Sequence, residues 1–143
     1  MYEKTPFWQD RENELIQPDL FSTTAENFAK RIARDNHQKP YPNKPTQIRR
    51  FFDEVVRFQS QAAALHQQTP KNREKEWNTI QSLLHMMVAK AAYAQGRDLI
   101  SPYFLEFIRT EIPEIKTPKD LKLFASFFEA FMGFYKLHGP KKG

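Results

Sequence analysis

The sequence predicts an all-α protein: a compact bundle of about five helices with an N-terminal extension. Three observations support this fold class. Apolar residues recur at intervals of three and four in several long segments, which is the spacing of one helix face. Hydroxyl residues followed by proline precede several of these segments, as at helix starts. No segment shows the apolar–polar alternation of a half-buried strand.

The chain is predicted to divide at a proline-rich linker. Prolines 40, 42 and 45 follow one another so closely that a helix cannot pass through them. Residues 1–45 are therefore expected to form an N-terminal arm, a short helix and this linker. Residues 46–143 are expected to form the helical bundle domain.

The N-terminal part is predicted to be extended before it becomes helical. Residues 1–21 contain aromatic side chains without periodicity, and Phe7 and Trp8 are expected to dock the arm. A helix is expected to begin at Thr23, because Thr23 and Glu26 have the spacing of a capping box, and to end near residue 36.

The first helix of the bundle is predicted to begin at Thr46 as its cap and to end near Gln68. Arg50 and Arg57 lie on the face opposite its apolar stripe and should be exposed. The residues of that stripe are Ile48, Phe51, Phe52, Val55, Phe58, Ala62 and Leu65.

The segment from Trp77 to Gln95 is predicted to be the helix around which the others pack, and it is expected to stop at Gly96. Its apolar residues cover nearly half of its circumference, more than a surface helix needs. They are Trp77, Ile80, Leu83, Leu84, Met87, Val88, Ala91 and Ala94. Lys90 and Arg97 lie about 20° apart at one border of this stripe. Tyr93, on the neighbouring face, is expected to be a half-buried packing residue.

Two further helices are predicted after this segment. Ser101-Pro102 opens a short helix that ends before Pro113, and Thr117-Pro118 opens the last helix. Asp120 is well placed for the dipole of that last helix. Thr69-Pro70 has the same form, and it offers an earlier start for the helix that contains Trp77.

The last helix, residues 121–138, is apolar around most of its surface. One interpretation is that it is buried within the bundle. The other is that Leu123, Phe127 and Phe134 cover another subunit, because a large exposed apolar patch normally marks an interface.

The positive charge is confined to the later part of the chain. Of 22 cations and 17 anions, seven of each precede Thr46, so the whole excess of +5 lies after it. This excess favours an anionic partner, with nucleic acid first. The cations have two interpretations: a solvated, salt-bridged surface, as Arg49–Asp53 and Arg50–Glu54 suggest, or a groove that follows phosphates.

The sequence contains no recognisable catalytic or metal-binding pattern. It has no cysteine, no glycine-rich phosphate loop and no His-Glu-x-x-His pair. The four histidines are not spaced to converge on one phosphate; they are His37, His66, His85 and His138. We therefore predict no enzymatic activity, no metal and no cofactor.

The sequence also predicts a cytoplasmic protein without a membrane partner. No apolar run approaches the roughly 18 residues of a membrane span, and the N-terminus lacks the pattern of a signal peptide.

Three stretches together resemble one family. They are TQIRRFFDEV at residues 46–55, the Lys90-x-x-Tyr93-x-x-x-Arg97 run, and FFEAFMGFYKLHGPKKG at residues 127–143. In this order they resemble the small subunit of type III-A CRISPR effector complexes. The resemblance covers about two-thirds of the chain, from Thr46 to the C-terminus.

The resemblance implies a non-catalytic subunit that works in an assembly. Family members are small helical bundles without nuclease activity, and several copies stack along the channel in which guide RNA pairs with target RNA. Their basic residues contact the RNA backbone, and cleavage belongs to other subunits. The expected partners are guide RNA, target RNA, other subunits of the complex and further copies of this chain, in a stacked filament or as a dimer in isolation.

The resemblance and the charge pattern together select the candidate RNA-binding residues. By motif position, Arg49 and Arg50 match the paired basic residues of the family, Lys90 and Arg97 its mid-helix cations, and Lys136 with Lys141 its tail. Arg57 is added because it shares the outward face of Arg50. The complete set is Arg49, Arg50, Arg57, Lys90, Arg97, Lys136 and Lys141.

The chain departs from the family pattern in two places. Gly139-Pro140-Lys141 stands where the family has Gly-Gly-Lys, and residues 1–45 have no counterpart in the pattern. These residues are expected to cap the bundle or to contact the next subunit.

Two other functions fit the same sequence. The first is a helical protein–protein scaffold without a nucleic-acid role, whose functional surface is the Phe-rich last helix. The second is a small RNA-cleaving enzyme that uses His85 or His138.

Overall fold

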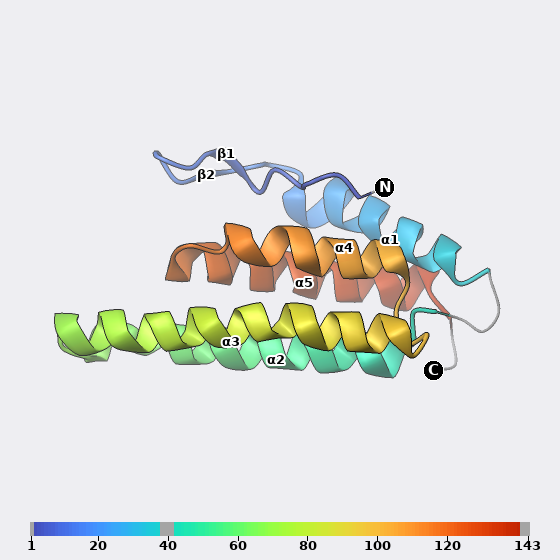
Figure 1. Ribbon diagram of the computed structural model, residues 1–143. Helices are drawn as coiled ribbons and strands as arrows, with labels where there is room; N and C mark the ends of the chain where they lie inside the picture. Colours follow the sequence, from blue (N-terminus) through green and yellow to red (C-terminus); the bar gives the residue numbers. More distant parts are fainter. Residues whose placement is uncertain (1, 38–41, 141–143) are drawn as a thin grey trace.

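The computed structural model describes residues 2–37 and 42–140, and it confirms an all-α bundle with an N-terminal extension (Figure 1). The five α-helices are α1 (Ala25–Asp35), α2 (Pro45–Ala63), α3 (Pro70–Gly96), α4 (Pro102–Glu111) and α5 (Pro118–His138). Short helical turns are η1 (Leu20–Thr24), η2 (Leu65–Gln67) and η3 (Ile112–Glu114), and the strands are β1 (Trp8–Asp10) and β2 (Leu15–Ile16).

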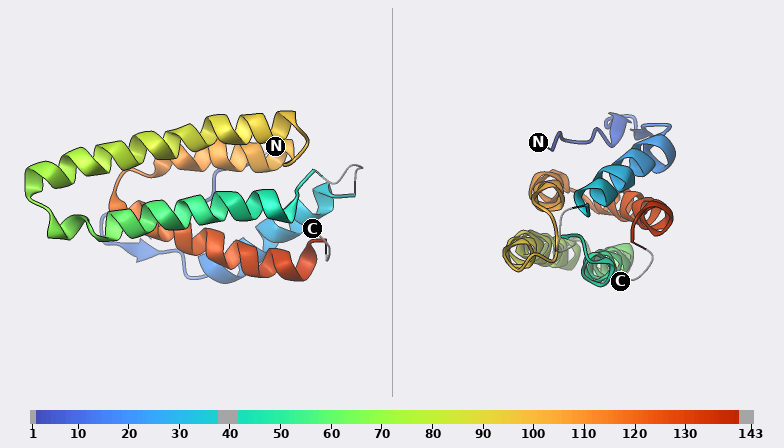
Figure 2. Two further views of the ribbon diagram at one scale, coloured as in Figure 1. Left: turned by 90° about the horizontal axis from the view of Figure 1, so that it is seen from below. Right: turned by 90° about the vertical axis from the view of Figure 1, so that its right-hand side faces the viewer.

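The helices form three layers. α2 and α3 lie side by side in one outer layer, α4 and α5 form the middle layer, and α1 lies with the N-terminal strands in the other outer layer (Figures 1 and 2). α5 packs against α1 on one side and α2 on the other, whereas α3 packs against α2 and α4. α5 is therefore covered from both sides.

The centre of the core is α5, so the prediction that the helix containing Trp77 is the centre is wrong. α5 contributes the largest set of buried aromatic side chains: Phe124, Phe127, Phe128, Phe131 and Tyr135. α3 buries one narrow line of residues, and Leu83, which widened the predicted stripe, is 44% exposed. The reason is the position of α3 in an outer layer, where it packs against two helices, α2 and α4, and the short turns η2 and η3.

The burial of α5 decides between the two interpretations of the last helix. Leu123 and Phe127 are buried within this chain, and Phe134 is partly buried against the same core. The Phe127 ring lies between Phe7 of the arm and Phe28 of α1, at centroid distances of 5.0 and 6.0 Å. The buried terminal helix is therefore confirmed, and the proposal that these residues cover another subunit is wrong for Leu123 and Phe127.

The hydroxyl–proline pairs mark three helix starts correctly. The side chains of Thr69, Ser101 and Thr117 accept hydrogen bonds from backbone N–H groups of the first turns of α3, α4 and α5. In α5 the carboxylate of Asp120 also accepts from the backbone N–H of Thr117 at 3.1 Å, which completes a capping box. The early start of α3 at Pro70 is confirmed.

Two predicted starts are wrong. Thr23 does not cap α1, because the π-helical turn η1 already begins at Leu20 and runs into α1. Thr46 does not cap α2, which begins at Pro45 after Lys44, without a side-chain cap. Proline is favoured at the first helical position because its φ angle is already helical and its missing N–H needs no partner.

The N-terminal arm contains a small hairpin that the sequence did not predict. β1 and β2 pair antiparallel, and the turn between them is closed by a hydrogen bond from the Glu14 N–H to the Arg11 carbonyl. Glu14 has φ 58°, a left-handed conformation, and Asn13 donates to the carboxylate of Asp10. The strands are too short to show a period of two.

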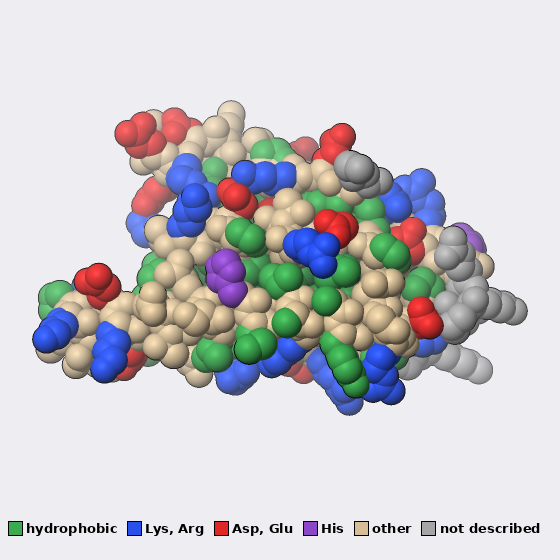
Figure 3. Space-filling model, in the orientation of Figure 1, with side chains coloured by type: hydrophobic (Ala, Val, Ile, Leu, Met, Phe, Trp, Pro, Cys, Tyr) green, Lys and Arg blue, Asp and Glu red, His purple; other side chains and the backbone are tan. Residues whose placement is uncertain are grey.

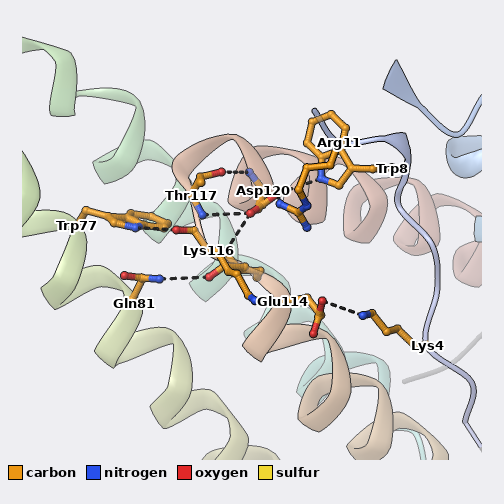
Figure 4. A network of polar contacts seen from close by, with 10 residues as sticks. Lys4, Trp8, Arg11, Trp77, Gln81, Glu114, Lys116, Thr117 and Asp120 are labelled. Carbon is orange, nitrogen blue, oxygen red and sulfur yellow. Dashed lines mark hydrogen bonds and ion pairs between the residues drawn. The ribbon is translucent and has the colours of Figure 1, made fainter. Parts of the chain in front are cut away.

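The arm is fastened to the α4–α5 junction by charged and aromatic contacts (Figure 4). Trp8 Nε1 and Arg11 donate to Asp120 Oδ1 at 2.9 and 2.5 Å, and Lys4 pairs with Glu114 at 2.8 Å. Phe7 packs against the core, which confirms that Phe7 and Trp8 dock the arm.

Two buried carboxylates beneath the arm differ in pKa. Burial raises the pKa of Glu111, and this effect outweighs the hydrogen bonds that it accepts from Tyr2 and from the Thr5 backbone. Burial also raises the pKa of Asp120, but hydrogen bonds from Arg11, the Lys116 backbone and Trp8 more than offset it, so the net pKa is lowered. Asp120 is therefore held as a carboxylate.

The predicted division into residues 1–45 and 46–143 stays a prediction. In the described chain, Phe28 and Ile32 of α1 belong to the same hydrophobic core as α2 to α5. Among the described helices, none is both long enough and apolar enough to cross a membrane.

Candidate nucleic-acid interface

A groove between α2 and α3 brings three of the predicted RNA-binding residues together. Arg50 comes from α2, Lys90 from α3, and Arg97 directly follows α3 as its C-cap. The groove has a volume of about 320 Å³ and is open to solvent. Its other lining residues are Gln47, Phe51, Glu54, Tyr93, Ala94 and Leu99. In Figure 3, Lys and Arg side chains gather along the edge of the molecule beneath α3, where α2 lies.

The packing of α2 against α3 produces this convergence. Phe51 and Ala94 are buried where the two helices meet, so the charged positions beside them flank the groove. Arg50 precedes Phe51 on α2, and Lys90 lies one turn before Ala94 on α3. All three cations are exposed because they border the buried line of each helix.

The end of α3 fixes the position of Arg97. The helix ends at Gly96, as predicted, but the residue with left-handed geometry is Asp98, at φ 61°. The Leu99 N–H donates to the Ala94 carbonyl at 2.9 Å, and the Asp98 N–H donates to the Gln95 carbonyl at 3.0 Å. These bonds form a Schellman motif, which places Arg97 at the C-cap beside the groove.

One anion partly neutralises the groove. Lys90 Nζ lies 2.8 Å from Glu54 Oε1, and the Glu54 side chain is only 16% exposed against 53% for Lys90. The predicted Arg50–Glu54 pair is absent, because Glu54 turns to α3 instead. Within the described residues, neither Arg50 nor Arg97 has an ion-pair partner, so two of the three cations are available to an anion.

Tyr93 lies in the same groove and is 67% exposed. The prediction that it is a half-buried packing residue is wrong, because α3 is an outer helix and no other element covers this face. The guanidinium carbon Cζ of Arg97 lies 5.8 Å from the centroid of the Tyr93 ring. The groove therefore combines cations with an accessible aromatic face.

A second groove brings Arg49 of α2 together with Lys136 of α5. It has a volume of about 500 Å³, and Met132 and Pro140 also line it. Arg49 pairs with Asp53 at 3.1 Å, as its spacing predicted. Tyr135 forms part of the wall, and burial raises its pKa to about 12 while its hydroxyl donates to the Asn43 carbonyl at 2.7 Å.

One predicted residue, Arg57, lies outside both grooves. Arg57 is exposed on α2, and its Cζ lies 4.8 Å from the centroid of the Phe58 ring. Lys141 falls outside the described residues. The structure therefore brings together Arg50 with Lys90 and Arg97, and separately Arg49 with Lys136.

Two features of the charged surface were not predicted from the sequence. Glu54 was expected to pair within α2, and its contact with Lys90 depends on how two helices pack. A groove of about 570 Å³ beside α1 is lined by Lys30, Arg34, His37 and His138. The spacing of Lys30 and Arg34 at four residues could have indicated this basic face.

The described residues hold no group of three or more His, Cys, Asp or Glu side chains that could bind a metal ion. His138 Nε2 lies 2.8 Å from Glu26, and His85 is exposed on α3.

The fold and the grooves define a small, mostly helical protein with basic residues on an outer layer. A comparison with protein-family models identifies the family. The model described as Csm2 Type III-A matches residues 17–141, and the chain belongs to this family, the small subunits of type III-A CRISPR-Cas complexes. Neither the curated proteins nor the solved structures that were searched contain a match.

The family match corrects, for residues 17–45, the expectation that residues 1–45 have no counterpart in the family; residues 1–16 lie outside the match. The match begins at residue 17 and therefore includes η1 and α1. The packing of α1 against α5 explains this extent, because α1 covers one side of the central helix.

Proposed function

We propose that this chain is a non-catalytic small subunit that contacts the backbone of guide and target RNA in a type III-A CRISPR complex. The observation that supports this function is the convergence of Arg50, Lys90 and Arg97 on one open groove between α2 and α3. Cations from two helices can contact phosphates along one strand. No single helix face would supply this arrangement.

The chemistry of the groove suits binding without sequence preference. Arginine forms bidentate hydrogen bonds with phosphate, and each phosphate that is neutralised releases counterions. Phosphate contacts position a nucleic acid but carry no sequence information. A subunit of an RNA-guided complex needs this property, because base pairing between guide and target already supplies the specificity.

The remaining predicted cations extend the same proposal. Arg49 and Lys136 share the groove between α2 and α5, and we assign them to phosphate contacts beside the first groove. Arg57 continues the exposed face of Arg50 along α2, and Lys141 follows α5 in sequence. We propose that the protein acts in the cytoplasm, in antiviral defence. Further copies of the chain are proposed to stack in the assembly, or to form a dimer when the protein is isolated. The proposal requires no cofactor.

Photo-crosslinking in the intact complex tests this function. A tagged chain is purified from its host with the bound subunits, irradiated, and digested to locate crosslinked RNA. We expect crosslinks in α2 and α3 next to Arg50, Lys90 and Arg97, and a large loss of them in the triple alanine variant. The matched control is Lys71→Ala with Lys75→Ala, which removes cations from the opposite end of α3. RNA crosslinks that avoid α2 and α3 in the wild type would contradict the assignment.

A further inference from the structure

Tyr93 contributes nothing evident to the fold. Its ring is 67% exposed, and it is not among the side chains that pack against the hydrophobic core. Within the described residues, its hydroxyl forms no hydrogen bond. The neighbouring helical positions Ala91 and Ala94 are buried and anchor α3 without it.

The surroundings of Tyr93 suit a nucleotide. At about 100° per residue, Lys90, Tyr93 and Arg97 lie within a sector of about 60° on α3. Arg97 Cζ lies 5.8 Å from the ring centroid, and Arg50 faces the same groove from α2. The ring therefore lies beside three cations that attract phosphate, and Glu54 is the anion that lines the same groove.

We infer that Tyr93 and Arg97 form a stacking site for an unpaired nucleobase within the α2–α3 groove. This inference rests on the proposed RNA-binding function and specifies its ligand. Tyrosine rings and guanidinium planes both stack on bases, and they tolerate any base because each base has a π-face. Arg50 then holds a phosphate on one side of the stacked nucleotide, and Lys90 holds one on the other side once a phosphate displaces Glu54 from it.

The site distinguishes single-stranded RNA from a continuous duplex. In an A-form duplex the bases are stacked on one another, and their faces are not accessible to a protein side chain. A duplex can reach the cations of the groove through its phosphates but cannot use Tyr93. A strand with an exposed base can use both.

Fluorescence anisotropy with a labelled RNA tests the site at low ionic strength, using one sequence as a single strand and as a blunt duplex. Replacing Tyr93 by alanine should weaken binding of the single strand about five- to one-hundred-fold. The loss on the duplex should be at least fivefold smaller. Tyr93→Phe should restore the affinity, because it keeps the ring, whereas Tyr93→Leu should not, because it keeps only the apolar bulk.

The outcomes separate this inference from the function on which it rests. Equal single-strand affinity for wild type and Tyr93→Ala, together with weaker binding by Lys90→Ala/Arg97→Ala, would overturn the stacking site and leave the phosphate groove intact. Unchanged binding in both variants, or no binding of either RNA by the wild type, would overturn both.

A protein partner is the other class of ligand that an exposed tyrosine could contact. Light scattering on the same variants tests it. If Tyr93→Ala lowers the mass of self-associated protein and leaves single-strand affinity unchanged, Tyr93 belongs to a contact between subunits and the stacking site is wrong.

Discussion

Glu54 sets the charge of the groove between α2 and α3. Its carboxylate is mostly buried and lies 2.8 Å from Lys90 Nζ, so it already pairs with one of the three cations of the groove. An anion next to a phosphate site also repels the ligand directly. If the groove binds RNA as proposed, Glu54 limits how strongly one subunit binds it.

Replacing Glu54 by glutamine should strengthen RNA binding about two- to tenfold at low salt, because it frees Lys90 and removes one negative charge. Isothermal titration or anisotropy with a single-stranded RNA measures the change. Glu74→Gln, exposed at the far end of α3 and outside the lining of the groove, is the matched control. Weaker binding by Glu54→Gln would show that the ion pair orients Lys90 for the ligand instead of competing with it.

Helical spacing predicted the exposure of Lys90 and Arg97 correctly, but it did not predict the exposure of Tyr93. The border positions of Lys90 and Arg97 follow from their spacing, and both are exposed beside the groove. The exposure of Tyr93 could not be predicted, because it depends on whether another element covers that face. For the same reason, Glu54 was predicted to form an ion pair with Arg50, whereas it pairs with Lys90 on the neighbouring helix.

At the scale of elements, the end of α3 connects stability to the groove. Asp98 adopts φ 61° within the Schellman motif, and the Leu99 carbonyl accepts from the Lys44 N–H at 3.0 Å just before α2 begins. This turn therefore joins the start of α2 to the end of α3, and Arg97 is the C-cap residue at that end.

Asp98→Gly should raise the free energy of unfolding by about 0.5–1 kcal/mol, because glycine adopts the left-handed conformation without the steric cost of a Cβ atom. Asp98→Val should lower it by more than that, since a β-branched residue fits this conformation poorly. Urea denaturation followed by circular dichroism measures both. A destabilised glycine variant would mean that the Asp98 side chain itself holds the turn.

The predictability of each helix start depended on local chemistry. Ser101-Pro102 and Thr117-Pro118 act within one turn, so their signals survive in any packing arrangement. The predicted start at Thr23 is wrong because the chain enters α1 through the π-helical turn η1, which has no side-chain cap. The hairpin of residues 8–16 depends on docking to α5 and could not be predicted from a two-residue strand.

At the scale of the molecule, the arm and the α2–α3 groove lie on different layers. The arm covers the α4–α5 junction, whereas Arg50, Lys90 and Arg97 lie in the α2–α3 layer (Figure 1). The centre at α5 could not be predicted from periodicity alone, because apolar width does not reveal which helix has neighbours on both sides.

Deleting residues 1–16 should lower the free energy of unfolding by at least about 2 kcal/mol and leave RNA affinity within about twofold. The deletion removes Phe7 from the core and leaves Glu111 and Asp120 without the partners that the arm supplies. Thermal denaturation and anisotropy measure the two effects. Unchanged stability would show that the docked arm adds no net energy, and a large loss of affinity would place RNA on the arm instead.

The salt dependence of RNA affinity tests the central claim most directly. Wild type, Lys90→Ala/Arg97→Ala and the control Lys71→Ala/Lys75→Ala are titrated with one single-stranded RNA from low to moderate salt, and circular dichroism confirms that each remains helical. We predict weaker binding only for Lys90→Ala/Arg97→Ala, with the slope of log K against log salt shallower by about 1 to 1.5, as expected for two lost phosphate contacts. Equal affinity and equal slope in this variant and the wild type would contradict the assignment of the α2–α3 groove to RNA.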